Sequence, residues 1–550
     1  MGTVAGLLAP DPGPLAQYRG RPSRFVARPD PADGAGDHRP GLPHRFGHGR
    51  KCLPGGDAPG QHGLALGVVG DTRTSGPTSA RWLSQATEPL VGSLAGCVVL
   101  SVRLGGVEPG GKEGGAVMTH ADAHESTDPA SLTPLLHDSM IEWDVLHQRY
   151  HGLLRLVDTL IGVVPNCDRY LEIWPPAFRT YNIMVPNLLN LPIPVFGVGG
   201  PPAGVVGLAM YVSSRTAGCA YCSAHTCSFA LRRGAAPDKV AAALLPDQGS
   251  FTRGELAAVA VARSLASVPC ELTAAERDEL VAAYGARDAE WIALGAVMMG
   301  FLNKFMDVVG VELEQSTAAE VADTMGADWS PGKAGAGLDP TSPRRPVPPA
   351  DGIRTKLGLV PLLPAAIRFD RRVQQGTPKR WPEVGRYLAG CTGHEFPVLE
   401  KLLSSRVRRA VASMLRENLD AASSVIGTRP KVMAGAIFAT VVENDLLLDD
   451  VRALARRARV DDDCLKAAVA FVGGDESAGP AEDPSEAAML TLARAAAYSP
   501  ARIDGSTVEA CNAAGLGAPA IVEMAAWLSV LQMLHRLTCY LGSPRGGERV

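Results

Sequence analysis

The sequence has few aromatic residues, no large excess of charge and no dense set of cysteines. Phenylalanine, tryptophan and tyrosine make up 5% of its 550 residues, whereas apolar residues of all kinds make up 46%. Alanine and leucine therefore supply most of the apolar share, which favours packed helices over sheets. A net charge of -4 gives no electrostatic reason to expect nucleic acid or an anionic membrane as a partner. We predict an all-α protein with neither of these partners.

The cysteine pattern is that of an intracellular protein. Eleven cysteines are scattered along the chain, most of them singly, and an odd number leaves at least one thiol unpaired. We also expect no stretch long and apolar enough to span a membrane. These features predict a chain in the reducing cytoplasm, and no motif calls for a bound cofactor or metal.

Composition divides the chain into four segments. Residues 1–117 are rich in Gly, Pro, Arg and Ser and cannot bury enough apolar area to fold. We predict that they are a disordered extension, or that they come from an upstream translation start that is not normally used. Helical periodicity begins near residue 130, and a Pro/Gly-rich stretch interrupts it. We therefore predict a helical domain over 118–328, a linker over 329–352 and a second helical domain over 353–550.

The two predicted helical domains resemble each other. TRGELAAVAVARSLASVP (252–269) matches PSEAAMLTLARAAAYSP (484–500), and GFLNKFMDVVG (300–310) matches QMLHRLTCYLG (532–542). Further upstream there is a looser match between FALRRGAAPDKV and RALARRARVDDD. The three blocks keep the same order at similar spacing, which predicts two copies of one helical unit.

A Cys-x-x-Cys motif with a histidine after it is the strongest chemical signal. Cys219 and Cys222 follow a predicted helix break, so we expect them in the first turn of a helix. Free N–H groups and the helix dipole stabilise a thiolate there. His225, one turn further on, is placed to take the Cys222 proton. Arg215, four residues before Cys219, would add positive charge near the thiols if its turn is helical. Two thiols one turn apart can close a disulfide, as two-electron chemistry requires.

Two other uses of a CxxC motif have to be weighed. Structural zinc would need two more ligands, for which Cys227, Cys391 and His394 are candidates. A thioredoxin fold would need a preceding strand in a βαβ pattern, and the sequence contains no such pattern. We therefore favour a redox thiol pair, with zinc binding or redox sensing without turnover as an alternative.

The stretch GCAYCSAHTCSFALRRG resembles the signature of alkylhydroperoxidase D-like proteins, within the carboxymuconolactone decarboxylase superfamily. GELAAVAVARSLASVP followed by GFLNKFMDVVGVELE supports the resemblance, which covers about 200–315 and extends weakly back to about 130. It implies an all-helical fold, homo-oligomeric assembly, and peroxidase-like reduction of a hydroperoxide with electrons from a thiol or lipoyl donor. Cys222 would attack the peroxide, Cys219 would resolve the sulfenic acid, and His225 would belong to the proton relay. The superfamily also offers a muconolactone decarboxylase-like lyase as an alternative, although those relatives do not use a CxxC pair.

The sequence departs from the family pattern at the proton relay. Gly207 stands where the best-studied members have a glutamate, and His225 follows the second cysteine by three residues instead of four. Asn303 and Asp307, at i and i+4 on a predicted helix, are candidates to replace the glutamate. The second copy reads ENDLLLD at 443–449 and keeps no cysteine pair. We expect it to be structural, packing on the first copy as one subunit packs on another.

Overall fold

In a computed structural model of the protein, the described residues are 130–245, 248–326, 329–473, 481 and 483–542. They form α-helices and 3-10 helices and contain no β-strand, which confirms the predicted all-α class for this part of the chain. All of them belong to one compact unit, Gly115–Val550. The prediction of a disordered extension over 1–117 lies outside the described residues.

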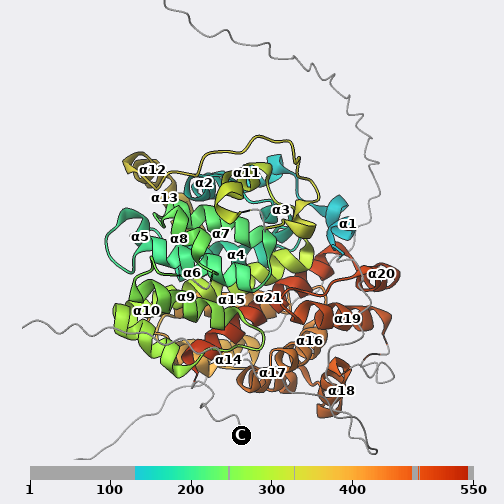
Figure 1. Cartoon of the computed structure of the whole chain (residues 1–550). Coiled ribbons are helices and arrows are strands. Elements are labelled where there is room, and N and C mark those ends of the chain that lie inside the picture. Colours follow the sequence, from blue (N-terminus) through green and yellow to red (C-terminus); the bar gives the residue numbers. More distant parts are fainter. Residues whose placement is uncertain (1–129, 246–247, 327–328, 474–480, 482, 543–550) are drawn as a thin grey trace, which may run out of the picture. The chain divides into compact units, whose positions relative to one another are not determined.

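The chain winds through two successive groups of helices, coloured blue to green and yellow to red in Figure 1. The first group consists of α1 (Thr133–Leu136), α2 (Trp143–Ile161), α3 (Cys167–Leu171), α4 (Pro175–Leu188), α5 (Ile193–Phe196), α6 (Ala203–Thr216), α7 (Ala220–Arg232), α8 (Pro237–Ala242), α9 (Arg253–Ala266), α10 (Ala274–Val309) and α11 (Gln315–Met325). The second consists of α12 (Ile353–Leu359), α13 (Leu363–Val373), α14 (Glu383–Thr392), α15 (Ser405–Leu419), α16 (Thr428–Val441), α17 (Asp445–Ala458), α18 (Asp462–Val472), α19 (Pro484–Ala497), α20 (Gly505–Ala513) and α21 (Ala518–Leu541).

The stretch between the two groups lies against the first. Its described residues form the 3-10 turn η2 (Gly332–Gly335) and otherwise run without regular structure. Backbone hydrogen bonds tie it to the helices beside it, from Arg345 N to Ala319 O and from Asp351 N to Arg232 O, both at 2.9 Å. The predicted domain boundaries stay a prediction, because the whole described chain forms one unit.

The two groups repeat one order of packing. Helix α6 contacts α7, α9 and α10, and α16 contacts α17, α19 and α21 in the same order. Capping residues start several of these helices: Thr252 and Glu255 form a capping box on α9, and Thr273 and Glu276 form one on α10. The repeat predicted from three sequence blocks thus has a counterpart in how the helices are arranged.

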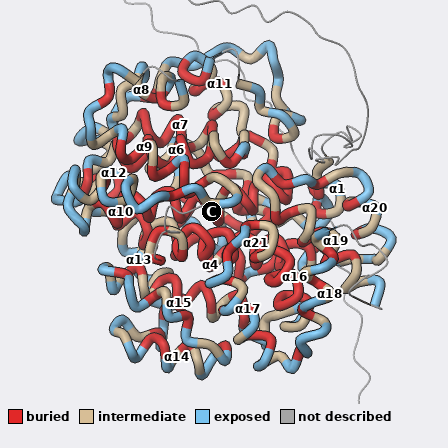
Figure 2. The backbone as a smooth tube through the Cα atoms, turned by 60° about the horizontal axis from the view of Figure 1, so that its bottom comes forward, coloured by how far each residue is buried: buried red, intermediate tan, exposed pale blue. Residues whose placement is uncertain are grey.

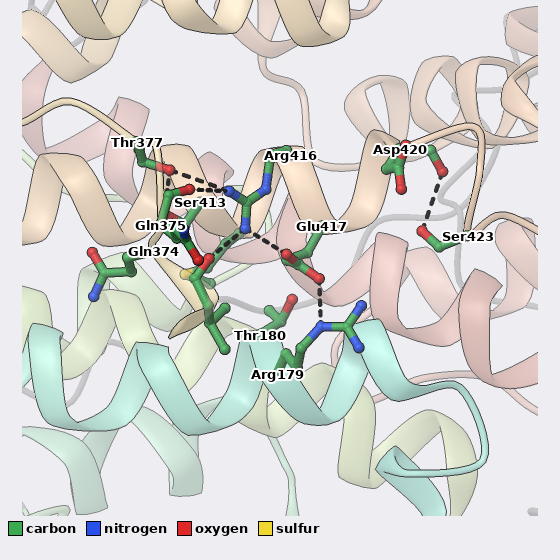
Figure 3. A network of polar contacts seen from close by, with 12 residues as sticks. Arg179, Thr180, Gln374, Gln375, Thr377, Ser413, Arg416, Glu417, Asp420 and Ser423 are labelled. Atoms are coloured by element: carbon green, nitrogen blue, oxygen red, sulfur yellow. Dashed lines mark hydrogen bonds and ion pairs between the residues drawn. The ribbon is translucent and has the colours of Figure 1, made fainter. Parts of the chain in front are cut away.

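Equivalent helices of the two copies pack on each other, α4 on α15 and α10 on α21. Contacts between like elements are typical of the isologous interface of a twofold dimer. Figure 3 shows the polar edge of the α4–α15 contact, where Arg179 Nε donates to Glu417 Oε2 at 2.6 Å. Arg416 Nη2 donates to the other oxygen of the same carboxylate at 2.5 Å. Helices of the two predicted copies thus contact each other, and the structural role of the second copy stays a prediction.

Helices α10 and α21 run through the core. Both are long and apolar enough to cross a membrane by length and composition, which corrects the expectation that no stretch of the chain reaches this length. Their most apolar windows are 94% and 89% buried inside the protein. Figure 2 shows buried residues along these inner helices, whereas outer ones such as α12 are mostly exposed. Such burial is typical of core helices.

Candidate active site

The CxxC motif begins helix α7, as the sequence predicts. Helix α6 ends at Thr216, and Gly218 then turns the chain with a left-handed φ of +71°. Cys219 is the N-cap of α7, and its Sγ accepts a hydrogen bond from the backbone N–H of Cys222 at 3.4 Å. The two side chains are 1% and 3% exposed, and the cysteines of the described residues are all free thiols.

The expected thiolate at Cys222 is not what this environment favours. Burial raises the pKa of the Cys222 thiol well above its usual value, and a hydrogen bond with Cys219 and the charges of Cys219, Cys167 and Asp307 raise it further. The helix N-terminus does donate an N–H to sulfur, but Cys219 is the acceptor. Burial therefore outweighs the helix dipole at Cys222. The surroundings of Cys222 therefore favour its protonated form.

His225 lies one turn after Cys222 and faces a carboxylate. Its Nε2 is 2.7 Å from Glu314 Oε2, and its ring packs on Tyr221 with 4.5 Å between ring centroids. The side chains of His225 and Glu314 are only 14% and 8% exposed. Within the described residues, the hydrogen bond of the His225 ring is to Glu314, not to the Cys222 sulfur as we predicted.

Glu314 is the functional residue that sequence reasoning missed. It is the N-cap residue of α11, and its Oε1 accepts hydrogen bonds from Tyr221 Oη at 2.9 Å and from the backbone N–H of Asn166 at 2.5 Å. Burial raises its pKa, but the charge and hydrogen bond of His225, together with the backbone N–H of Asn166, outweigh burial, so the net pKa is lower than usual. Glu314 thus sets a carboxylate with a lowered pKa against His225.

Position 207 has no room for a side chain. A Cβ atom on Gly207 would lie 2.7 Å from the Cα of Ala230, because α6 and α7 cross there backbone to backbone. A real Cβ does not approach another carbon so closely, and the helices would have to separate to admit one. The close crossing leaves no space for a glutamate at position 207, and the carboxylate beside His225 comes from the start of α11.

The three accessory candidates do not contact His225. Arg215 Nη1 donates to Tyr211 Oη at 3.0 Å. Its positive charge acts to lower the pKa of the Cys227 thiol, against the larger effect of burial. Asn303 Nδ2 donates to the carbonyl of Ser213 at 3.4 Å. Asn303 therefore has no contact with the proton relay in which we predicted a role for it, and Arg215, predicted to add positive charge near Cys219, bonds Tyr211.

Asp307 ties the site to its surroundings. Its Oδ2 accepts the backbone N–H of Ala501 at 2.6 Å, and its Oδ1 pairs with Lys333 at 2.9 Å. Its charge also contributes to the raised pKa of Cys222. Asp307 therefore links the first copy to the second. We predicted it as a candidate to replace the family glutamate, but its partners are Ala501 and Lys333.

An apolar cavity of about 90 Å³ lies over Cys222 and His225. Apolar and sulfur-containing side chains make up most of its wall, including Cys167, Met210, Met298, Met299, Leu302 and Met306. A second cavity, of about 170 Å³, shares the wall residues Ile161, Tyr181, Val185 and Phe229 with the first. Cys222 and His225 thus face a small apolar space beside a larger one, and Cys219 lines neither.

The second copy closes the opposite side of the motif. A Cβ on Gly218 would lie 3.0 Å from Cδ of Pro500, so the 496–500 turn packs directly on the residue before Cys219. Lys304 Nζ, which is buried, donates to the carbonyls of Ala496 at 2.6 Å and of Ala497 at 3.3 Å. The thiol pair is therefore enclosed by both copies.

The segment of the second copy that corresponds to the CxxC motif has a similar helix cap but no cysteine. Asn444 caps α17 as Cys219 caps α7, with its Oδ1 accepting the N–H of Leu447 at 3.0 Å. Asp450 follows at the spacing of His225 and pairs with His394 Nε2 at 2.6 Å. The prediction that the second copy has lost the cysteine pair is consistent with this arrangement.

The proposed zinc ligands are not brought together. Cys227 is buried in α7, Cys391 is exposed on α14, and His394 pairs with Asp450. Among the residues that the structure describes, no three His, Cys, Asp or Glu side chains form a group that could hold a metal ion.

No family model matches the sequence, and no curated protein matches it. Among solved structures, the debrominase Bmp8 in its apo form is 21% identical, with a TM-score of 0.29 over 34% of this chain and 96% of the other. A Bmp8 variant in complex with 2,3,4-tribromopyrrole is 20% identical, with the same TM-score over 34% and 95% of the two chains. At this level of similarity, neither structure assigns a family or an activity to the chain.

Proposed function

We propose that this chain is a thiol-dependent oxidoreductase that reduces a small apolar hydroperoxide, or a disulfide, at Cys222. The observation that carries the proposal is the cavity wall, on which Cys222 and His225 stand side by side among apolar groups. Cys219 Sγ accepts the backbone N–H of Cys222 at 3.4 Å, and its assigned role in this proposal is to resolve an oxidised Cys222. A nucleophile, a proton carrier and a resolving thiol are the parts that such a reaction needs.

In the first step, His225 accepts the Cys222 proton and the thiolate attacks the terminal peroxide oxygen. The O–O bond breaks, Cys222 becomes a sulfenic acid, and the alkoxide leaves as an alcohol with the proton returned from His225. In the second step, the Cys219 sulfur attacks the Cys222 sulfur and water leaves. The peroxide gains two electrons, and the two thiols become one disulfide. A thiol or lipoyl donor then restores both thiols by exchange.

Glu314 serves this chemistry by holding His225 in place. Its carboxylate stabilises the imidazolium that forms when His225 takes the Cys222 proton, and the hydrogen bonds from Tyr221 and Asn166 fix the carboxylate. A buried carboxylate beside a histidine fixes its orientation and its basicity. Glu314 is therefore a positioning residue for the proton carrier.

The cavities favour an apolar substrate of modest size. The larger one, of about 170 Å³, is close in volume to an engineered cavity of ~150 Å³ that binds benzene. Methionine side chains in the wall of the smaller one adapt to different shapes. An aryl or short alkyl hydroperoxide would place its apolar part in the larger cavity and its peroxide against Cys222.

Disulfide mapping tests the proposal. The full-length reduced protein is treated with one equivalent of cumene hydroperoxide, alkylated, digested and analysed by mass spectrometry. We expect a disulfide between Cys219 and Cys222 and one equivalent of alcohol. This disulfide should form faster than the exposed thiol of Cys391 is oxidised. Intact Cys219 and Cys222 thiols after the peroxide is consumed would count against the proposal. Activity on another substrate that survives thiol alkylation would favour a lyase, and stoichiometric zinc would favour a metal-binding protein.

Replacing Glu314 by glutamine is expected to lower the rate of peroxide reduction about 100-fold, because His225 then loses the charge that stabilises its protonated form. The rate is measured by stopped flow over a range of pH. The matched control is Glu320→Gln on the same helix, which removes a carboxylate that bonds Ser228 and Arg232 of α7, away from the cavity. Equal rates for wild type and Glu314→Gln would remove Glu314 from the mechanism.

A further inference from the structure

A surface pocket of about 640 Å³ lies between helices of the two copies. Its walls come from α2 and α4 of the first copy and from α13 and α15 of the second. The pocket has a strong excess of positive charge. Five arginines and one glutamate line it: Arg149, Arg179, Arg368, Arg372, Arg416 and Glu417. None of these charged residues lines either cavity of the candidate active site, so the pocket is separate from that site.

The carboxylates near the pocket offset only part of this charge. Figure 3 shows that Glu417 is shared: its Oε2 accepts from Arg179 Nε at 2.6 Å, and its Oε1 accepts from Arg416 Nη2 at 2.5 Å. A second carboxylate, Glu172, pairs with Arg149 Nη1 at 3.2 Å. Two carboxylates therefore balance at most two of the five arginines.

Two of the five arginines are free to bind a ligand. Arg368 and Arg372 are exposed on α13, and neither makes a side-chain hydrogen bond or an ion pair with the described residues. Like charges at i and i+4 repel each other and destabilise a helix. The acidic residue of α13, Asp370, does not line the pocket, and its Oδ1 accepts from Asn187 Nδ2 at 2.7 Å. An anion in the pocket would relieve this repulsion.

Close packing holds α13 against the first copy. A Cβ on Gly152 of α2 would lie 2.6 Å from the Cβ of Ala365, so the two helices touch at this glycine. Phe369, which lies between the two free arginines in the sequence, packs edge-on against Tyr150 and Phe178 at 6.1 and 6.2 Å between ring centroids. The backbone that carries the arginines is thus fixed before a ligand binds, which lowers the entropy cost of binding.

We propose that this pocket is a second ligand site, which binds a small organic phosphate. Guanidinium groups donate pairs of hydrogen bonds that match phosphate oxygens, and a phosphate carries up to two charges to set against Arg368 and Arg372. The pocket's volume lies within the ~300–1,000 Å³ typical of small-molecule sites. It leaves room for an organic group beside Tyr150 and Phe369, which also line it.

Titration calorimetry of the full-length protein with ADP and with pyrophosphate tests the proposal. We expect one ADP per chain, bound more tightly at about 50 mM than at about 150 mM salt. Arg368→Gln/Arg372→Gln should weaken binding at least about tenfold, because two charged donors are lost. The matched control, Arg354→Gln/Arg371→Gln, removes two exposed arginines of α12 and α13 that do not line the pocket. It should bind ADP nearly as tightly as the wild type.

A variant with the opposite expected effect locates the ligand. Glu417→Gln removes the negative charge from the pocket wall and should tighten ADP binding about threefold. If this variant does not fold, the Arg368→Gln/Arg372→Gln comparison decides.

Three results would overturn the proposal. The first is that ADP does not bind, or binds the wild type and Arg368→Gln/Arg372→Gln equally well. The second is that citrate binds as tightly as pyrophosphate, which would indicate a site for any anion. The third is that a hexaglutamate peptide binds more tightly than ADP, which would indicate a docking surface for an acidic protein.

Discussion

Replacing Cys222 by serine is expected to lower kcat/KM for an aryl hydroperoxide by at least about 1,000-fold, because the sulfur that takes the oxygen is gone. The loss should appear in kcat, since the apolar cavity that binds the substrate is unchanged. Cys219→Ser should behave differently. It leaves Cys222 able to react once, so a single equivalent of peroxide is consumed before turnover stops.

The matched control is Cys227→Ser on the same helix. Cys227 is fully buried and lines neither cavity, and burial raises the pKa of its thiol to about 12 against the effect of Arg215. It is therefore expected to be inert, and its serine variant should keep wild-type activity. If Cys222→Ser also kept that activity, a thiol mechanism at this site would be ruled out.

The largest effect on stability is expected from Lys431→Met. Lys431 Nζ and Glu523 Oε1 are 2.5 Å apart in the core of the second copy, with side chains 2% and 0% exposed. Glu523 also accepts the backbone N–H groups of Val425 and Ile426 at 2.7 and 3.1 Å. Removing the ammonium leaves a buried carboxylate without its counter-charge, which costs about 3–5 kcal/mol of unfolding free energy.

Urea unfolding measures this loss against two controls. Lys466→Met removes an exposed lysine that pairs with Asp463, and it should leave the unfolding free energy close to that of the wild type. The double variant Lys431→Met/Glu523→Leu removes both charges and should recover much of the stability. A Lys431→Met protein as stable as Lys466→Met would show that the buried pair contributes nothing.

Local signals predicted the helices and the position of the motif well. The break at Gly218 and the cap at Cys219 involve neighbouring residues, so their geometry follows from turn and capping preferences. The thiolate predicted at Cys222 was wrong for a physical reason. Helix N-termini favour a thiolate, but how deeply a residue is buried depends on the whole fold, and burial wins here.

The residues that sequence reasoning missed act across long distances in the chain. Glu314 reaches His225 from 89 residues away, and Arg536 reaches Ser213 from 323 residues away. No spacing rule connects such pairs. Glu314 is the last residue of the stretch GFLNKFMDVVGVELE. A carboxylate in the loop after a core helix follows no sequence pattern that predicts contact with a distant histidine.

The contact of α4 with α15 and of α10 with α21 has a further consequence. In a dimer of separate chains, such an interface dissociates on dilution, and every substitution occurs twice. Here one chain holds both halves, so the second half is present at an effective concentration that dilution does not change. Each half also acquires substitutions independently. Cys219 can therefore persist in one half while Asn444 stands at the matching helix start in the other, and the fused pair can divide its tasks between the two.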